Sequence, residues 1–290
     1  MKAVCLFAAY YNSSQIPYYI RVYITELRKH FDDVILLPGD RELNQADREF
    51  LANNKLQVMH TETGGYDFGL WYRALARLDL GNVDRLALIN DSCVLFAPLD
   101  KFMQWSRSVE ARVKGMTISD AVAPHLQSYF LIFDKEALGH VTDYFNHHKT
   151  YHSISDVIKN YEIGLSVYLS EKGLKLAAYM DNEGYHGEFS PYYRCINYHL
   201  ANGIPLIKKK ILFGSYRTDE LPNLARMGFD VSATYYVNRI KEHHNQLIID
   251  LDRLIQENPS QLGYLQRFGF NLRKFMIKLA RPIYGRLKGA

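Results

Sequence analysis

The chain has 290 residues, of which 48% are apolar and 23% are charged, and this balance indicates a globular protein with a sizeable core. The three cysteines, Cys5, Cys93 and Cys195, are far apart and lie in apolar or aromatic surroundings, which argues against a disulfide framework and a zinc site. The N-terminal apolar run is too short for a transmembrane helix and is not a signal peptide, so we expect a cytosolic protein. The net charge of +4 is modest, so the distribution of the charges matters more than their sum.

Predicted strands alternate with predicted helices in the N-terminal part. Residues 3–10 form a continuous apolar run, as expected of a central strand. A helix is predicted at 18–30, and short strands are predicted at 34–37 and 56–60. This alternation favours an α/β fold with a mostly parallel, doubly wound sheet.

A glycine-containing segment, GGYDFG at 64–69, precedes an amphipathic stretch at 70–78, so we expect a glycine loop that leads into a helix. The next strand, at 85–89, runs directly into the polar turn Asn-Asp-Ser at 90–92. In an open α/β sheet the ligand crevice lies beyond the carboxyl ends of the strands. The residues of this turn are therefore candidates for the site.

The second half has weaker patterns and no internal repeat. In chain order we predict a buried strand at 127–133, a helix at 161–172 that ends at Gly173, an irregular segment at 178–198, a basic and apolar run at 205–213, and helix at 233–257.

The turn at 90–92 is the sharpest local signal. An acidic residue at the end of a hydrophobic strand can hold a divalent cation or the ribose of a nucleotide. Asn, Asp and Ser are also the usual residues of turns and helix caps, so these three residues alone leave a structural role open. The longer string LALINDSCVLFAP at 86–98 is more informative, because it combines a strand, a polar turn and a second apolar run.

Five segments of the chain resemble, in this order, the rhamnan synthesis F family. They are YDFGLWYRAL at 66–75, LINDSCVLFAPL at 88–99, QSYFLIFDKEAL at 127–138, YEIGLSVYLSEKG at 161–173 and NGIPLIKKKIL at 202–212. Proteins of this family are linked to rhamnose-containing and other bacterial surface polysaccharides and look like GT-A glycosyltransferases. The resemblance implies a GT-A-like, Rossmann-like domain over residues 1–262, with a mostly parallel sheet flanked by helices, and a C-terminal helical tail at 263–290.

The resemblance also assigns a role to the polar turn. Asn90, Asp91 and Ser92 take the place of the Asp-X-Asp motif with which many GT-A enzymes hold a metal ion and the donor diphosphate. Only Asp91 is charged here, and one carboxylate is a weak site for Mg²⁺ or Mn²⁺, although the donor phosphates supply further oxygens. A divalent cation bound by Asp91 is therefore implied as a cofactor, but metal dependence is left open.

Glu162 falls where many GT-A enzymes place an acidic residue that contacts the acceptor hydroxyl. A carboxylate at this position can act as a general base and deprotonate that hydroxyl. The alternative is a glutamate at a helix N-terminus that is stabilised by the helix dipole. Glu162 and Asp91 are the predicted catalytic residues.

Further donor-binding residues are expected next to a predicted helix and in a lysine run. Tyr66, Asp67 and Gly69 lie just before the helix at 70–78, where small residues and free amides can approach a nucleotide. A capped helix start explains them equally well. In the run at 208–210 only one lysine needs to point inward on a strand, and we choose Lys208 to neutralise the leaving diphosphate. A solvated basic patch is the alternative.

Four residues are predicted to bind the acceptor. Gln127, Ser128 and Tyr129 resemble the acceptor-side strand of the family, although the beginning of a buried strand explains them nearly as well. His186 lies in the irregular segment and could contact the acceptor, whereas an isolated histidine more often satisfies a local hydrogen bond.

The C-terminal segment 264–290 differs in character from the rest. Apolar residues recur at helical spacing, the segment has no acidic residue, and its basic residues are Arg267, Arg273, Lys274, Lys278, Arg281, Arg286 and Lys288. This pattern predicts an interfacial helix attracted to anionic lipid, and a helix docked on the protein's own core is the alternative. No upstream nucleic-acid recognition module is found, so we expect no nucleic-acid partner.

With the features above, the resemblance implies a hexosyltransferase of bacterial surface polysaccharide synthesis (O-antigen of lipopolysaccharide, rhamnan or capsule). Its donor would be dTDP-rhamnose or another nucleotide hexose such as UDP-galactose, and its acceptor a lipid-linked glycan. We expect a peripheral protein on the inner face of the cytoplasmic membrane that could assemble with other glycosyltransferases. The alternatives are a non-catalytic nucleotide- or glycan-binding subunit of an assembly complex, which the missing acidic residues keep open, and a membrane-recruiting scaffold.

Overall fold

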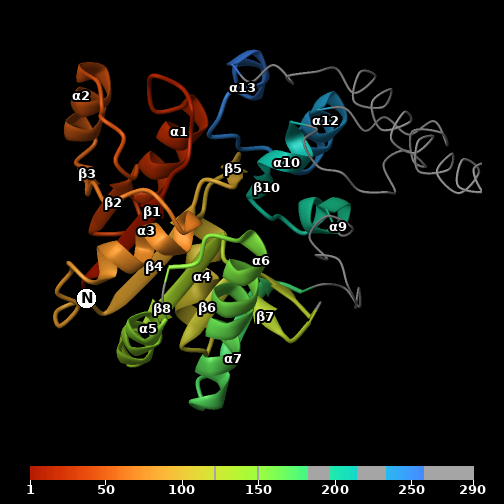
Figure 1. Ribbon diagram of the computed structural model, residues 1–290. Coiled ribbons are helices and arrows are strands. Elements are labelled where there is room, and N and C mark those ends of the chain that lie inside the picture. Colours follow the sequence, from red (N-terminus) through yellow and green to blue (C-terminus); the bar gives the residue numbers. More distant parts are fainter. Residues whose placement is uncertain (121, 149, 182–195, 214–232, 258–290) are drawn as a thin grey trace, which may run out of the picture.

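The structure is a computed structural model that describes residues 1–120, 122–148, 150–181, 196–213 and 233–257 (Figure 1). The strands are β1 (Ala3–Ala8), β2 (Asp33–Leu37), β3 (Gln57–Val58), β4 (Arg85–Asn90), β5 (Cys93–Leu95), β6 (Val113–Ser119), β7 (His125–Leu126), β8 (Phe130–Asp134), β9 (Leu176–Met180) and β10 (Leu206–Lys208). The helices are α1 (Tyr18–Leu27), α2 (Gln45–Asn53), α3 (Tyr66–Leu75), α4 (Asp100–Ser108), α5 (Lys135–His147), α6 (Ile154–Val157), the π-helix η1 (Ile158–Ile163), α7 (Gly164–Glu171), α9 (Ile196–Ala201), α10 (Lys209–Leu212), α12 (Ala233–His243) and α13 (Leu251–Glu257).

An eight-stranded sheet forms the centre of the molecule. Its strand order is β3-β2-β1-β4-β8-β6-β7, and β9 pairs with β6. Strands β1, β2, β3, β4, β6 and β9 share one direction, whereas β8 and β7 run the opposite way. The predicted α/β class, with a mostly parallel sheet flanked by helices, is therefore confirmed.

Strand β1 is apolar throughout because helices cover both faces of the sheet. Cys5 and Phe7 belong to a core shared with α1, whereas Val4, Leu6 and Ala8 belong to a second core shared with α3, α5 and α7. Side chains alternate between the two faces of a strand, so a strand covered on both faces has no polar positions.

The topology places the site at the carboxyl ends of β1 and β4. The chain adds β2 and β3 on one side of β1 and then places β4 on the other side, which makes this position the topological switch point where α/β sheets bind ligands. Strands β5 and β10 form a separate antiparallel ladder in which Lys208 lies opposite Cys93. This ladder brings a late part of the chain close to the end of β4 (Figure 1).

Helix α3 begins earlier than predicted, so Tyr66 and Asp67 lie in its first turn and not in a loop before it. Gly64 and Gly65 have φ angles of 129° and 75°, which glycine adopts without strain, and Gly65 is the N-cap. A Cβ atom on Gly69 would lie 2.0 Å from the carbonyl oxygen of Gly64. The prediction was wrong because this helix start has glycines in place of a side-chain cap.

The helical region around Glu162 also differs from the prediction. It begins at Ile154 and continues through η1 into α7, so Glu162 lies in a π-helix inside a longer helical run. The prediction of a helix N-terminus, and with it the dipole alternative, is therefore wrong. Short π-helical insertions are frequent at functional sites because they reposition side chains within a helix.

Several other predictions have mixed outcomes. The strand predicted at 127–133 begins only at Phe130, and the helix predicted at 233–257 is divided into α12 and α13. His186, Cys195 and the segment 264–290 lie outside the described residues. In the described part of the chain no helix is both long and apolar enough to cross a bilayer.

Candidate active site

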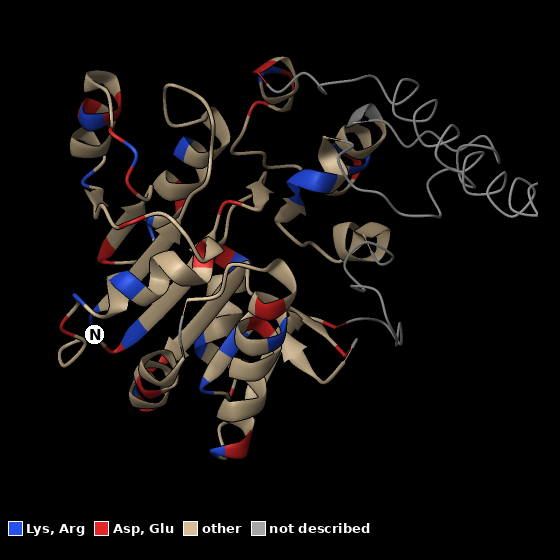
Figure 2. Ribbon diagram, viewed as in Figure 1, with Lys and Arg blue, Asp and Glu red and all other residues tan. Residues whose placement is uncertain are grey.

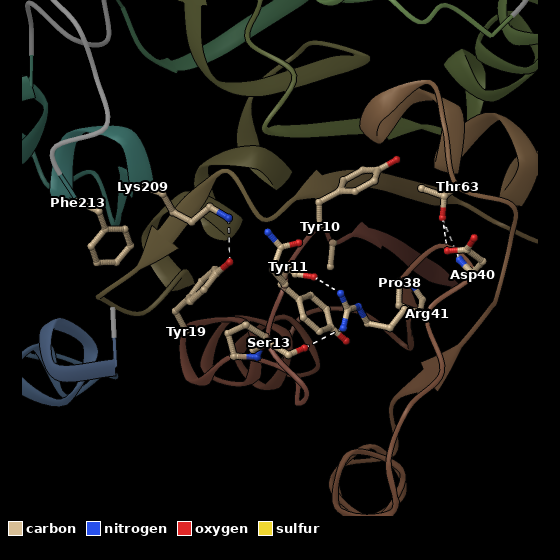
Figure 3. Close-up of a pocket in the computed structure, with 13 residues that line it drawn as sticks. Tyr10, Tyr11, Ser13, Tyr19, Pro38, Asp40, Arg41, Thr63, Lys209 and Phe213 are labelled. Carbon is tan, nitrogen blue, oxygen red and sulfur yellow. Dashed lines mark hydrogen bonds between the residues drawn. The ribbon is translucent and has the colours of Figure 1, made fainter. Parts of the chain in front are cut away.

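A cavity of about 770 Å³ lies at the carboxyl ends of β1 and β2 (Figure 3). Tyr10 and Tyr11 line it from the loop after β1, Asp40 and Arg41 from the loop after β2, and Lys209 from α10. This volume is within the usual range for small-molecule sites. Of these residues only Lys209 lies in a segment singled out from the sequence, the run at 208–210, although the positions of Tyr11 and Asp40 soon after predicted strands were a usable signal.

Arg41 fixes the loop that follows β1. Its guanidinium group donates from Nη1 to the carbonyl oxygen of Ser13 (2.8 Å) and from Nη2 to that of Tyr11 (2.5 Å). The same group lies 4.7 Å from the centroid of the Tyr11 ring. Thr63, which also lines the cavity, donates a hydrogen bond to Asp40 in the loop after β2. The cavity thus has an aromatic surface with polar groups at its edge, which suits a planar ligand with hydrogen-bonding groups.

Asp91 is 6% exposed and accepts hydrogen bonds from three segments of the chain. The backbone N–H of Tyr10 donates to Oδ1 (3.2 Å), whereas the hydroxyl of Tyr19 (2.9 Å) and Nζ of Lys209 (2.6 Å) donate to Oδ2. Lys209 also donates to the hydroxyl oxygen of Tyr19 (2.8 Å). Burial, followed by the Asp91 carboxylate, raises the pKa of Tyr19, so this hydroxyl stays a neutral donor. Asp91 therefore forms an ion pair with Lys209 and accepts two further hydrogen bonds beside it.

This arrangement does not fit a divalent cation at the polar turn. Mg²⁺ and Mn²⁺ require several oxygen ligands, and both oxygens of Asp91 already accept hydrogen bonds. The ammonium group of Lys209 lies 2.6 Å from Oδ2 and would repel a cation bound there. The neighbouring amide of Asn90 donates its Nδ2 hydrogen to Asp67 and accepts at Oδ1 from the backbone N–H of Ser92 (3.1 Å).

A different group in the described residues has the geometry to hold a metal ion. Glu26, His30 and Asp100 offer ligand atoms within 4.8 Å of one another. They lie around the C-terminal end of α1, whereas the cavity lies at the N-terminal end of this helix. Glu26 already accepts hydrogen bonds from the backbone N–H of Leu99 (3.1 Å) and pairs with Lys29 (2.6 Å). These contacts engage the carboxylate of Glu26 without an ion.

Glu162 is held by the segment between β7 and β8. Its Oε2 accepts hydrogen bonds from the hydroxyl and the backbone N–H (3.1 Å) of Ser128, and its Oε1 lies 3.7 Å from Nε2 of His125. Burial raises the pKa of Glu162, but the bonds from His125 and Ser128 and the charge of Lys208 outweigh burial and lower it overall. The side chain is 21% exposed. Glu162 is therefore an ionised, accessible carboxylate at neutral pH.

Lys208 and Lys209 both approach the site, because β10 ends at Lys208 and α10 begins at Lys209. Alternation between strand faces stops at this junction, so Lys209 approaches the site as well as Lys208, the lysine chosen from the sequence. Nζ of Lys208 lies 4.1 Å from the centroid of the Tyr129 ring and donates to Oγ of Ser92 (3.4 Å). Lys210 is exposed. In Figure 2 the short helix α10 is coloured as a basic segment.

Asp67 is a second carboxylate of this region, and its titration differs from that of Glu162. Its Oδ2 accepts a hydrogen bond from the Asn90 amide, and its Oδ1 accepts one from the backbone N–H of Phe68 (3.1 Å). Burial, together with the charge of Glu162, raises the pKa of Asp67 to about 6, against the opposing bond from Asn90. Two nearby carboxyl groups with separated pKa values are typical of acid–base sites.

The residues predicted to bind the acceptor are largely internal. Gln127 and Tyr129 are buried, and both hydrogen-bond to Oγ1 of Thr117, at 2.8 Å and 2.9 Å. Ser128 is buried as well and orients the carboxylate of η1 described above. These contacts support the geometry of the site from within the sheet. His186 is outside the described residues, so its predicted contact with the acceptor stays a prediction.

The sequence matches the protein family described as rhamnan synthesis protein F over residues 35–263. This range includes Asp67, Asp91, Glu162, Lys208 and Lys209. None of the curated proteins compared with the chain matches it.

Similar solved structures have low identity to the chain. A cytidylyltransferase from Leptospira borgpetersenii is 12% identical, with 90% of this chain and 96% of that chain covered and a TM-score of 0.41. 4-Diphosphocytidyl-2C-methyl-D-erythritol synthase from Anaerococcus prevotii is 10% identical, with 65% of this chain and 90% of that chain covered and a TM-score of 0.38. Glucosyl-3-phosphoglycerate synthase from Mycobacterium tuberculosis is 12% identical, with 61% of this chain and 69% of that chain covered and a TM-score of 0.36. At this level of similarity none of the three specifies the chemistry of this chain.

The ion pair of Asp91 and Lys209 can be tested by a double-mutant cycle. Asp91→Asn leaves the ammonium group without its counter-charge, and we expect it to lower the free energy of unfolding by about 1–3 kcal/mol. Lys209→Met should cost a similar amount. In urea unfolding the double variant should lose less than the sum of the two single losses. Strictly additive losses would contradict the pairing.

The raised pKa of Asp67 makes a prediction about stability and pH. The folded protein holds this proton at a pH where the unfolded chain has lost it, so stability falls as the pH rises from the unfolded pKa, 3.8, to about 6. Asp67→Asn removes this titration. Between about pH 4 and about pH 7.5, the free energy of unfolding of the wild type, measured in urea, should fall by on the order of 2 kcal/mol relative to that of the variant. A constant difference between the two proteins would show that Asp67 titrates normally.

Proposed function

Because the chain belongs to the rhamnan synthesis protein F family, we propose that it is a glycosyltransferase that transfers a hexose from a nucleotide-sugar donor during bacterial polysaccharide synthesis. The observation that carries this proposal is the ionised, accessible carboxylate of Glu162 close to a cationic side chain, Lys208, at the switch point of the sheet. The nucleoside of the donor occupies the adjacent cavity, between the loops that follow β1 and β2.

The reaction follows from these positions. The hydroxyl oxygen of the acceptor attacks the anomeric carbon of the donor sugar while its proton passes to the carboxylate of Glu162. The bond from the anomeric carbon to the phosphate oxygen breaks, and its electron pair leaves with the nucleoside diphosphate. The hydrogen bonds from Ser128 and the neighbouring His125 keep Glu162 ionised and oriented for this step.

The finer features of the proposal come from the family and from the sequence. The donor is dTDP-rhamnose or another nucleotide hexose such as UDP-galactose, and the acceptor is a lipid-linked glycan of O-antigen, rhamnan or capsule synthesis. The catalytic domain extends over residues 1–262. The basic segment 263–290 holds it at the inner face of the cytoplasmic membrane.

The proposal is tested by incubating the purified protein with dTDP-rhamnose or UDP-galactose and measuring release of the nucleoside diphosphate. A glycosyltransferase hydrolyses its donor slowly when no acceptor is present, whereas a nucleotide-binding subunit or a scaffold does not. Release from one donor above the rate in buffer supports the proposal. Binding of the donor without any release favours the non-catalytic alternative.

Glu162→Gln is expected to lower turnover by roughly a hundredfold or more while donor affinity stays nearly unchanged, as for loss of a general base. Glu171→Gln is the matched control, because Glu171 ends the same helical run and is exposed. Initial rates and calorimetric donor titrations of the three proteins give both quantities. Wild-type turnover in the Glu162 variant would leave this carboxylate with a structural role.

Removal of residues 264–290 should release the protein from anionic vesicles and leave donor hydrolysis intact. Each basic residue near an acidic surface adds about 1 kcal/mol of attraction, so binding of the full chain should also weaken with salt. Sedimentation with vesicles at low and high ionic strength measures both effects. Equal sedimentation of the two forms would show that this segment is not the anchor, and unfolding of the shortened form would assign it to the core.

A further inference from the structure

At the end of β4, Lys209 of α10 lies at the carboxylate for which the resemblance left a donor-binding metal ion open. Asp91 is the one acidic residue of the turn at 90–92, and it accepts hydrogen bonds from Tyr10, Tyr19 and Lys209. The ammonium nitrogen of Lys209 lies 2.6 Å from Oδ2, the oxygen that a metal ion would need. The positive charge that neutralises the Asp91 carboxylate therefore comes from Lys209 of the protein itself.

We infer that Lys208 and Lys209 together replace the divalent cation: they bind the diphosphate of the donor and stabilise it as it leaves, so transfer does not require a metal ion. This inference rests on the proposed function and deepens it. It also changes the role of Asp91 from a metal ligand to a positioning residue that acts through Lys209.

Both lysines are attached to a rigid part of the site. Lys208 is paired with Cys93 in the ladder of β10 and β5, and the backbone N–H of Lys209 donates to the carbonyl oxygen of Ser92 (2.9 Å). The two ammonium groups contact neighbouring residues of the turn after β4, Lys208 at Ser92 (3.4 Å) and Lys209 at Asp91 (2.6 Å). Donors that are fixed before the reaction stabilise developing charge without a cost of reorganisation.

Lys209 also has the access and the hydrogen-bonding capacity that a phosphate requires. It lines the cavity and its side chain is 24% exposed. An ammonium group has three N–H donors, and the bonds to Asp91 and Tyr19 use two of them. We expect the third to donate to a phosphate oxygen of the donor when it binds.

The inference assigns the charges of the transfer step. As the bond between the anomeric carbon and the phosphate oxygen breaks, its electron pair stays on that oxygen, and the added negative charge is opposed by the two ammonium groups. The proton of the acceptor hydroxyl moves to Glu162. No oxidant, reductant or metal ion enters this balance.

The test measures binding of dTDP and UDP to the full chain by calorimetry, in EDTA and in Mg²⁺ or Mn²⁺. We expect the nucleotide that binds to do so in EDTA, with affinity changed less than about threefold by metal. Lys208→Met and Lys209→Met should each weaken binding at least about tenfold, as loss of a charge-assisted hydrogen bond implies. Lys210→Met, in the same run but exposed, should stay within about twofold.

Binding that appears only with Mg²⁺ or Mn²⁺ overturns the inference, and so does an equal effect of all three lysine variants. The comparison of EDTA with metal uses the wild type, so it holds even if Lys209→Met unfolds. Thermal unfolding in EDTA checks that chelation leaves the fold intact. Donor hydrolysis, measured in the same buffers, separates the two proposals: intact binding in EDTA without hydrolysis in any buffer contradicts the glycosyltransferase and supports the diphosphate site.

Discussion

The ion pair between Asp91 and Lys209 is the interaction on which the geometry of the site depends. It joins residues 118 positions apart and fixes α10 at the end of β4. The same carboxylate accepts bonds from Tyr19, at the start of α1, and from the loop after β1 through Tyr10. Four segments therefore converge on one buried group. Without this convergence the cavity at the switch point would lose the wall formed by α10.

The pairing of Asp91 with Lys209 leaves different roles to the other charged groups of the site. Because this carboxylate is paired with a lysine, the other two carboxyl groups of the region, Glu162 and Asp67, are the candidates for acid–base chemistry. Hydrogen bonds keep the first ionised, whereas burial keeps the pKa of the second near 6. Hydrogen bonds from the surrounding elements hold both groups, from Ser128 to Glu162 and from Asn90 to Asp67. The buried Thr117, with its bonds to Gln127 and Tyr129, is part of that support.

The central sheet was predictable because its signal is local. Strands β1, β2 and β4 are covered on both faces and appear as apolar runs, and the motifs near 66, 90 and 162 identified three of the segments that form the site. The beginning of α3 was missed because glycines, and no side-chain cap, start it. The π-helix and the role of Lys209 were missed because they depend on packing between distant segments, which no local periodicity contains. Which lysines of the run 208–210 point into the site depends on where β10 ends. Only the structure shows that it ends at Lys208.

In the proposed mechanism lysines, and not a metal ion, hold the donor diphosphate at the end of β4. A crystal structure of the protein with a bound nucleoside diphosphate, grown in Mn²⁺, with anomalous data at the manganese edge, distinguishes the two arrangements. We expect phosphate oxygens within hydrogen-bond distance of Nζ of Lys208 and Lys209, with no anomalous peak beside Asp91. An anomalous peak bridging Asp91 and the diphosphate, with Lys209 displaced, would show that a metal ion holds the diphosphate.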